Sequence, residues 1–392
     1  MATIAPRDLT LALLRAALHP APEHPSTAPG TVPEPVEGVE GPVVRQAHQP
    51  VPVEGPVDWP AVFSYATSQG IAVNAFDGYI AAYSDILPMS DAVKEAWLVE
   101  TFSLETLAIA QRDTASGMAA TFAKNGLQTY VLKGEVISEC YPIPSHRKTL
   151  DLDCFLIPTN REGLGSDNGG AWEKGNSLME NDGIEVTRDF YKHSAFKFPL
   201  LKVENHQFFT PFRGDKLLKK LEILLQSKVK ADPGQDKIEG TELLRPPVMV
   251  SALFILEHAL SHFLLDGLSI RHVIDWMLFW RRHEGDIDKE EFERYVEEFR
   301  FGAFRDSLVA AGEFILGERE YSSLSDVQRR FLDSVLDGMY DHDDTPGLKS
   351  KLQTARNIIR STWRYHAFSP MSMPKALWIK VKGFLFDKNP SL

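Results

Sequence analysis

The spacing of apolar residues changes twice along the chain and divides the sequence into three parts. Over residues 59–125, and again from residue 216 onward, apolar residues recur every three or four positions, which is the period of a helix. Between these parts, apolar and polar residues alternate in short runs, which is the period of a strand with one buried face. The predicted strands of this middle part cover residues 127–132, 150–157, 184–190, 193–198 and 201–208.

Local signals mark where several of the predicted helices begin and end. Two helices are expected over residues 59–87 and 90–125, and Asn125-Gly126 is a typical end for the second of them. In the C-terminal part, Ser269 can cap a helix because its hydroxyl accepts hydrogen bonds from free backbone N–H groups. We therefore predict an α+β fold, in which a small mixed β-sheet core has flanking helices and a mostly helical C-terminal half.

One segment near the N-terminus lacks the composition of a folded element. Residues 20–60 hold eleven of the 25 prolines, and Pro35-Val36-Glu37-Gly38 recurs as Pro52-Val53-Glu54-Gly55. Such a segment buries too little apolar surface to offset its chain entropy, so it is predicted to be a disordered insertion. The predicted division is an N-terminal helix (1–19), the proline-rich insertion (20–58), an N-terminal helical region (59–125), a core (126–215) and a helical C-terminal domain (216–392).

Composition and net charge exclude several classes of protein. The chain has 392 residues, of which 43% are hydrophobic and 24% charged, as in an ordinary globular protein. Its net charge of −12 argues against non-specific nucleic-acid binding, which needs a basic face. Only Cys140 and Cys154 are present, too few for a cysteine zinc cluster, and free thiols favour a reducing, cytoplasmic location. No apolar run reaches the ~18–20 residues of a transmembrane helix, so none is expected.

Residues 131–153 contain the highest density of candidate functional residues. An apolar run ends at Lys133 and Gly134, where backbone N–H groups can face a phosphate. Asp151 and Asp153 lie two apart in an apolar strand, so both carboxylates project from one face. Two such charges repel each other unless a cation lies between them, and Mg²⁺ prefers carboxylate oxygens. The pattern therefore predicts a Mg²⁺ site beside a nucleoside triphosphate.

Three blocks of the sequence resemble the motifs of the uncharacterised nucleotidyltransferase family, which belongs to the polymerase-β-like superfamily. The resemblance runs from about residue 90 to the C-terminus and leaves the N-terminal segment uncovered. The blocks are Leu132-Lys133-Gly134 with Tyr141-Pro142, Arg147 and Asp151-x-Asp153; then Lys202-Val203-Glu204-Asn205-His206; and then His262 through Arg271 to Asp275.

The resemblance implies a reaction and a set of metal ligands. The expected activity moves a nucleoside monophosphate from a triphosphate such as ATP to a hydroxyl acceptor, which the sequence does not identify. Two Mg²⁺ ions are expected, because a pair of ions can bridge the attacking and leaving oxygens. Asp151 and Asp153 are the expected metal ligands. Glu204 is the expected third carboxylate, as a base or a second metal ligand.

The same resemblance assigns the nucleotide-binding residues. The triphosphate is expected to contact Lys133, Gly134 and Arg147, whose planar guanidinium suits a phosphate oxygen. His206 shares a strand face with Glu204 and is expected to orient it or to contact phosphate. The expected border of the nucleotide cleft is formed by His262, Arg271 and Asp275.

Structural roles remain open for several of these side chains. His206 is equally consistent with a buried structural histidine. The spacing of the other charges also fits plain ion pairs, namely Arg147 with Glu135 or Asp151, and Arg271 with Asp275.

Two departures from the family pattern support an alternative hypothesis about function. Glu135 stands where the superfamily mostly has serine, and Glu204 stands where aspartate is more common. The alternative function is a non-catalytic nucleotide- or partner-binding protein on the same fold. A third hypothesis is a zinc hydrolase, because His258 and His262 lie four residues apart on a predicted helix. The sequence contains no phosphate loop, dinucleotide fingerprint or nucleophile elbow that would predict a kinase or a serine hydrolase.

Overall fold

The computed structural model describes residues 3–18, 55–160, 170–211, 215–339, 360–369 and 374, without the side chains of residues 189 and 190. Apart from residues 55–58, the predicted proline-rich insertion lies outside the described residues.

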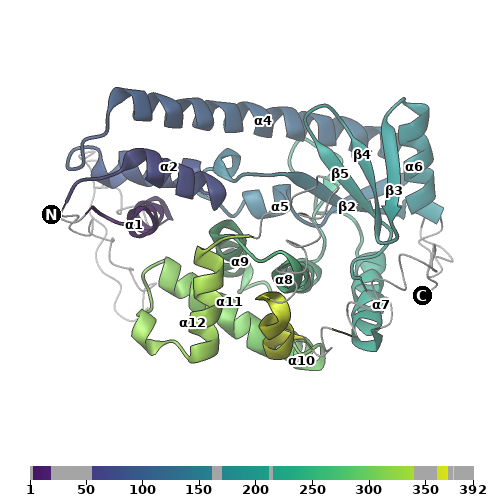
Figure 1. Ribbon diagram of the computed structural model, residues 1–392. Coiled ribbons are helices and arrows are strands. Elements are labelled where there is room, and N and C mark those ends of the chain that lie inside the picture. Colours follow the sequence, from purple (N-terminus) through teal and green to yellow (C-terminus); the bar gives the residue numbers. More distant parts are fainter. Residues whose placement is uncertain are drawn as a thin grey trace, which may run out of the picture.

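The centre of the protein is one mixed sheet of six strands (Figure 1). The strand order is β3-β4-β5-β2-β1-β6, in which β2 pairs with β5 and β1 with β6 in parallel, and the remaining pairs are antiparallel. The five predicted strands are present, whereas the two-residue β6 is too short for alternation to have predicted it. The strands are β1 Leu127–Val131, β2 Asp151–Pro158, β3 Glu185–Phe190, β4 His193–Lys197, β5 Lys202–His206 and β6 Leu243–Leu244.

One face of the sheet packs against the helices α4 (Asp91–Lys124) and α6 (Ala171–Asn181). Phe122 of α4 and Met179 of α6 share a core with Leu152, Cys154 and Leu156 of β2. The predicted helix over residues 90–125 is confirmed as the 34-residue α4, which runs along the top of the view in Figure 1. Since strand side chains alternate, the odd-numbered residues of β2 point to the opposite face.

That opposite face packs against the C-terminal half. Phe155 of β2 shares a core with Leu221 of α7 (Lys216–Ala231), Phe254 of α8 (Val248–Leu265) and Trp276 of α9 (Ile270–His283). Ser269 begins α9 with a capping box, as its position in the sequence predicts. The remaining helical segments of this half are α10 (Lys289–Glu298), α11 (Gly302–Ile315), the 3₁₀ turn η4 (Tyr321–Ser323), α12 (Asp326–Leu336) and residues 360–368.

Within the described residues, α8 is the single helix with the length and mean hydropathy (1.8) to cross a membrane. About two thirds of it (67%) is buried inside the protein, so these properties are those of a core helix. Glu257 and His258 interrupt its apolar sequence. Both lie on the same side of the sheet as the odd-numbered residues of β2.

The N-terminal helices differ from the prediction at one place. The chain forms α1 (Pro6–Leu18), within the helix predicted over residues 1–19, and α1 packs closely on α3 (Ala72–Gly78). The predicted single helix over residues 59–87 is wrong, because α2 (Trp59–Ser68) ends before Gly70, whose φ of +72° is unfavourable for a residue with a side chain. After Gly70 the chain continues as α3 and a π-helical turn, η1 (Tyr79–Tyr83).

Candidate active site

The parallel pairing of β2 and β5 brings three carboxylates onto one face of the sheet. Asp153 lies opposite Glu204, and Asp151 lies opposite Lys202 in the next pair of the register. The ligand atoms of Asp153, Glu204 and His206 all lie within 4.8 Å of one another. The convergence of acids that the sequence indicates is therefore present, while their metal-binding and catalytic roles stay predictions.

Asp153 is the most buried member of this acidic centre, with 1% of its surface exposed. His206 donates from Nε2 to Oδ1 of Asp153 at 2.8 Å, whereas Oδ2 of Asp153 has no hydrogen-bond partner in the described part of the chain. Burial acts to raise the pKa of Asp153, but the hydrogen bond and charge of His206 outweigh burial and hold this pKa well below its usual value. A buried, charged oxygen without a partner is costly, and a cation would satisfy it.

The other two acids lie nearer the surface. Burial and the charge of Asp153 together raise the pKa of Asp151, which is half-buried. Glu204 contacts Lys202 at 2.6 Å and Nε2 of His193 at 3.3 Å. Burial acts to raise the pKa of Glu204, but the nearby histidines and Lys202 leave it lower than usual. Lys202 and the neighbouring imidazoles therefore favour the ionised form of Glu204 beside Asp153.

The turn at Gly134 lies against the start of β2. Gly134 has a φ of +77°, and a Cβ atom there would lie 3.4 Å from the carbonyl oxygen of Asp151. The positive φ explains why glycine occupies this position, since the contact with Asp151 is of ordinary van der Waals length. Glu135 forms an ion pair with Arg112 of α4 at 3.3 Å.

Lys133 extends from this turn into the space between the sheet and α8. Its Nζ lies 3.1 Å from Nε2 of His258, which in turn lies 3.1 Å from Nε2 of His262. Burial lowers the pKa of Lys133, although the charges of Asp153 and Asp151 oppose that shift. His258, which the sequence suggested only as a zinc ligand, thus lies beside Lys133 at the acidic centre. The four-residue spacing from His262 was the signal for it.

The zinc hypothesis has little support in this geometry. The histidine pair is not part of any group of three possible ligands within 4.8 Å among the described residues, and a lysine ammonium lies beside it. Structural zinc sites are almost always four-coordinate, and catalytic ones have three protein ligands.

Arg147 and Asp275 form a buried ion pair rather than either of the ion pairs considered for Arg147. The guanidinium donates from Nε to Oδ1 and from Nη2 to Oδ2 of Asp275, both at 2.8 Å. Tyr141 adds a hydroxyl donor to Oδ1 at 2.7 Å, and Nη1 of Arg147 donates to Thr149. The interpretation that Arg147 forms an ion pair with Glu135 or with Asp151 is therefore wrong. Direct phosphate binding by Arg147 stays a prediction, although two edges of its guanidinium are already occupied.

Arg271 lies beside this pair and joins α9 to the segment before β2. It donates from Nη1 to the carbonyl oxygen of Lys148 at 3.2 Å and lies 3.9 Å from Oδ2 of Asp275. The helical ion pair that the spacing predicts is thus present as a long contact. Together with Arg147, Arg271 holds the chain that leads into Asp151 against the C-terminal half.

A histidine between two carboxylates fixes the start of the same segment. His146 of the 3₁₀ turn η2 (Pro144–His146) faces Asp77 of α3 at 2.8 Å from Nδ1 and Glu105 of α4 at 3.0 Å from Nε2. The ring donates to both carboxylates only when both nitrogens are protonated. Burial acts to lower the pKa of His146, but the two hydrogen bonds and carboxylate charges outweigh it and raise the pKa.

This raised pKa predicts a loss of stability with increasing pH. The contribution of protonated His146 is fully present below about pH 6.5, its ordinary pKa, and disappears as the pH rises through the folded-state pKa. We expect His146→Gln to lower the free energy of unfolding by about 1–2 kcal/mol at acidic pH. This difference from the wild type should shrink as the pH rises. Urea titrations across pH measure it, and a difference that stays constant contradicts the prediction. The exposed His366 provides the control: His366→Gln should leave the pH dependence unchanged.

Two buried charged residues, Lys192 and Glu257, lie near the acidic centre. Lys192 lies in the turn between β3 and β4, is 8% exposed, and places its ammonium 5.6 Å from the ring centroid of Phe254. Glu257 of α8 is 2% exposed and accepts a hydrogen bond from Ser261 at 2.6 Å. Burial raises the pKa of Glu257, while the charge of Lys192 opposes the shift. Lys192 belongs to no motif, so only the fold reveals it.

Comparison with known proteins gives one positive result. The family model described as "Uncharacterised nucleotidyltransferase" matches residues 55–309, which is more than half of the chain. This range includes the acidic centre, the Gly134 turn, α8 and α9. Neither the curated proteins nor the solved structures contain a match.

Proposed function

Because this chain belongs to the uncharacterised nucleotidyltransferase family, we propose that it transfers a nucleoside monophosphate from a nucleoside triphosphate to a hydroxyl group. The observation that carries this proposal is the in-register pairing of Asp153 with Glu204, beside Asp151 and His206. In the reaction, the acceptor oxygen forms a bond to the α-phosphorus. The bond from that phosphorus to the bridging oxygen breaks, and pyrophosphate leaves.

The acidic centre fits a divalent cation. It offers only oxygen and imidazole donors, and the buried Oδ2 of Asp153 has no partner among the described residues. We propose that Asp151, Asp153 and Glu204 hold Mg²⁺, which prefers carboxylate and phosphate oxygens. When bound, Mg²⁺ neutralises phosphate charge and polarises the phosphoryl oxygens.

The protein's own groups bind the phosphates and the acceptor. The Gly134 turn and the ammonium of Lys133 lie on the β1 side of the acids, where they can bind the triphosphate. The acceptor then approaches from the β5 side, where the carboxylate of Glu204 can take the hydroxyl proton. Arg147 and Asp275 hold the Gly134 turn and the start of β2 in position. Such positioning is a large part of catalysis in phosphoryl transfer.

A screen with two labels tests this function. The protein is incubated with Mg²⁺, cell extract and each triphosphate, labelled on either the α- or the γ-phosphate. We expect label from the α-phosphate, and none from the γ-phosphate, on an acceptor, together with pyrophosphate release. Transfer of γ-label would indicate a kinase and would contradict the proposal. Tight nucleotide binding without transfer or pyrophosphate release would support a non-catalytic nucleotide-binding protein instead.

A further inference from the structure

The ammonium of Lys133 lies beside the acidic centre but is bound to neither of its aspartates. Lys133 is 9% exposed, and the charges of Asp153 and Asp151 act to raise its pKa, so both acids lie near it. In the part of the chain that the structure describes, no ion pair joins Lys133 to either acid. The one hydrogen-bond partner of its Nζ among those residues is Nε2 of His258, at 3.1 Å.

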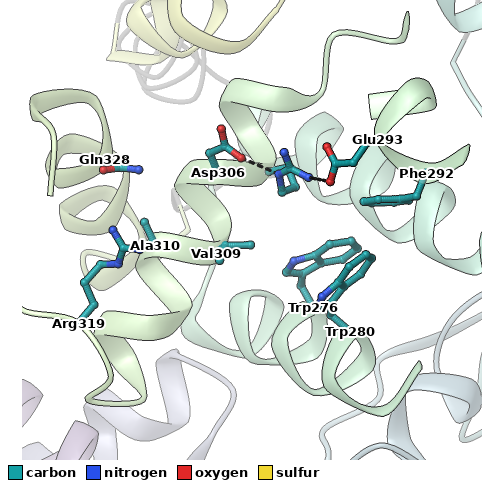
Figure 2. A pocket seen from close by; sticks show the side chains of 10 residues that line it. Trp276, Trp280, Phe292, Glu293, Asp306, Val309, Ala310, Arg319 and Gln328 are labelled. Atoms are coloured by element: carbon teal, nitrogen blue, oxygen red, sulfur yellow. Dashed lines mark hydrogen bonds and ion pairs between the residues drawn. The ribbon is translucent and has the colours of Figure 1, made fainter. Parts of the chain in front are cut away.

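Arg305 shows how a cation with two acids beside it ordinarily behaves in this protein. It lines a hollow among α9, α10, α11 and α12, and forms ion pairs with Glu293 at 2.7 Å and with Asp306 at 2.6 Å (Figure 2). The ammonium of a lysine is carried on a flexible stem of four carbons, so it too can turn toward nearby carboxylates. A contact outside the acidic centre must therefore hold Lys133 where it lies.

The hydrogen bonds around His258 determine which of its ring nitrogens is unprotonated. An ammonium has three donors and no acceptor, so Nε2 of His258 accepts from Lys133. Nε2 of His262 lies 3.1 Å from the same nitrogen and therefore donates to it. His258 is thus a neutral ring with its proton on Nδ1. Burial and the charge of Lys133 lower the pKa of His258 well below its usual value, in agreement with a neutral ring.

The ring of His258 is packed from both sides along α8. Phe254 lies one turn before it, with ring centroids 5.5 Å apart, and His262 lies one turn after it, with centroids 4.6 Å apart. Side chains four residues apart are neighbours on a helix surface, so the three rings form one column. This packing orients the acceptor nitrogen of His258 toward Lys133.

From these contacts, we propose that His258 is a positioning residue, which holds the Lys133 ammonium away from Asp151 and Asp153 and so keeps both carboxylates open to a divalent cation. The inference rests on the metal site of the proposed function. Without the acceptor nitrogen, Lys133 turns to the acids, because opposite charges attract more strongly in a buried site than in water. An ammonium paired with Asp151 or Asp153 then competes with the cation for the same oxygens.

Binding of Mn²⁺ alone, followed by electron paramagnetic resonance, tests the inference without a nucleotide or an acceptor. His258→Leu removes the acceptor nitrogen and should weaken Mn²⁺ binding about tenfold, because the cation must displace Lys133 from the acids. His258→Gln retains an acceptor oxygen and should bind Mn²⁺ within about twofold of the wild type. Circular dichroism verifies that each variant is folded.

His283 of α9 provides a matched control. It also packs on an aromatic ring four residues earlier, with its centroid 4.9 Å from that of Phe279, but it lies 3.5 Å from Asp286 and contacts no lysine among the described residues. His283→Leu should therefore leave Mn²⁺ affinity unchanged. An equal loss in His283→Leu and His258→Leu would indicate a general effect of losing a packed ring and would overturn the inference.

A double variant separates positioning from packing. Adding Lys133→Met to His258→Leu removes the cation that covers the acids, so Mn²⁺ affinity should return to the wild-type value or exceed it. Lost packing alone would not be repaired by a second substitution. If the wild type binds Mn²⁺ but His258→Leu binds it equally well, or if Lys133→Met does not restore the loss, the inference alone is overturned. A wild type that does not bind Mn²⁺ overturns the proposed metal site, and the inference with it.

Discussion

Replacing Asp153 with asparagine is expected to abolish nucleotidyl transfer while the protein remains folded. Asparagine has nearly the same shape and can still meet the Nε2 of His206, but it removes the buried charge whose Oδ2 has no partner among the described residues. Loss of a group that stabilises transition-state charge costs on the order of 10³-fold in rate. Pyrophosphate release and label transfer measure the loss, and circular dichroism verifies the fold.

Metal binding gives a second measurement that does not require the acceptor. Mg²⁺ or Mn²⁺ should raise the melting temperature of the wild-type protein, because a ligand that binds only the folded state stabilises it. The rise should be absent in Asp153→Asn and unchanged in Asp182→Asn, which alters an exposed acid after α6. A normal transfer rate in Asp153→Asn, or an equal rise in its melting temperature, would remove Asp153 from the metal site.

Replacing Asp275 with asparagine is expected to cause the largest loss of stability. The substitution leaves the guanidinium of Arg147, which is 2% exposed, without its carboxylate partner. Breaking one side of a buried ion pair costs about 3–5 kcal/mol, mostly because the remaining charge stays buried. Burial acts to raise the pKa of Asp275, but Arg147 holds that pKa far below its usual value, so this stability is lost only in strong acid. Urea unfolding midpoints measure the loss.

Two further variants separate the buried charge from the loss of packing. Arg147→Met combined with Asp275→Leu removes both charges and should recover much of the stability that Asp275→Asn loses, since apolar replacement of a buried pair is often neutral. Asp326→Asn breaks an exposed ion pair with Arg329 and should not measurably shift the midpoint. If Asp275→Asn behaved like Asp326→Asn, the pair would not be the buried link that holds the Gly134 turn to α9.

Local sequence was sufficient for the strands and helices around the site. Alternation over residues 150–157 and 201–208 placed Asp151 with Asp153, and Glu204 with His206, on single strand faces, because side-chain direction follows from a period of two. The glycine turn after Lys133 and the Ser269 cap were also local signals, since each depends on one backbone conformation. Where a helix pattern extended through Gly70, the apolar spacing was misleading, and a single positive φ ended α2.

The partners of these residues depended on the tertiary structure. Asp153 meets Glu204 because β2 and β5 pair in parallel, although the β3–β4 hairpin lies between them in sequence. Arg147 meets Asp275 across 128 positions, and Lys133 meets His258 across 125. A residue's own neighbours determine its secondary structure and the face on which it lies. Contacts between distant segments form only where strand register and helix packing bring two faces together. The periodic pattern of apolar residues does not specify which faces these are.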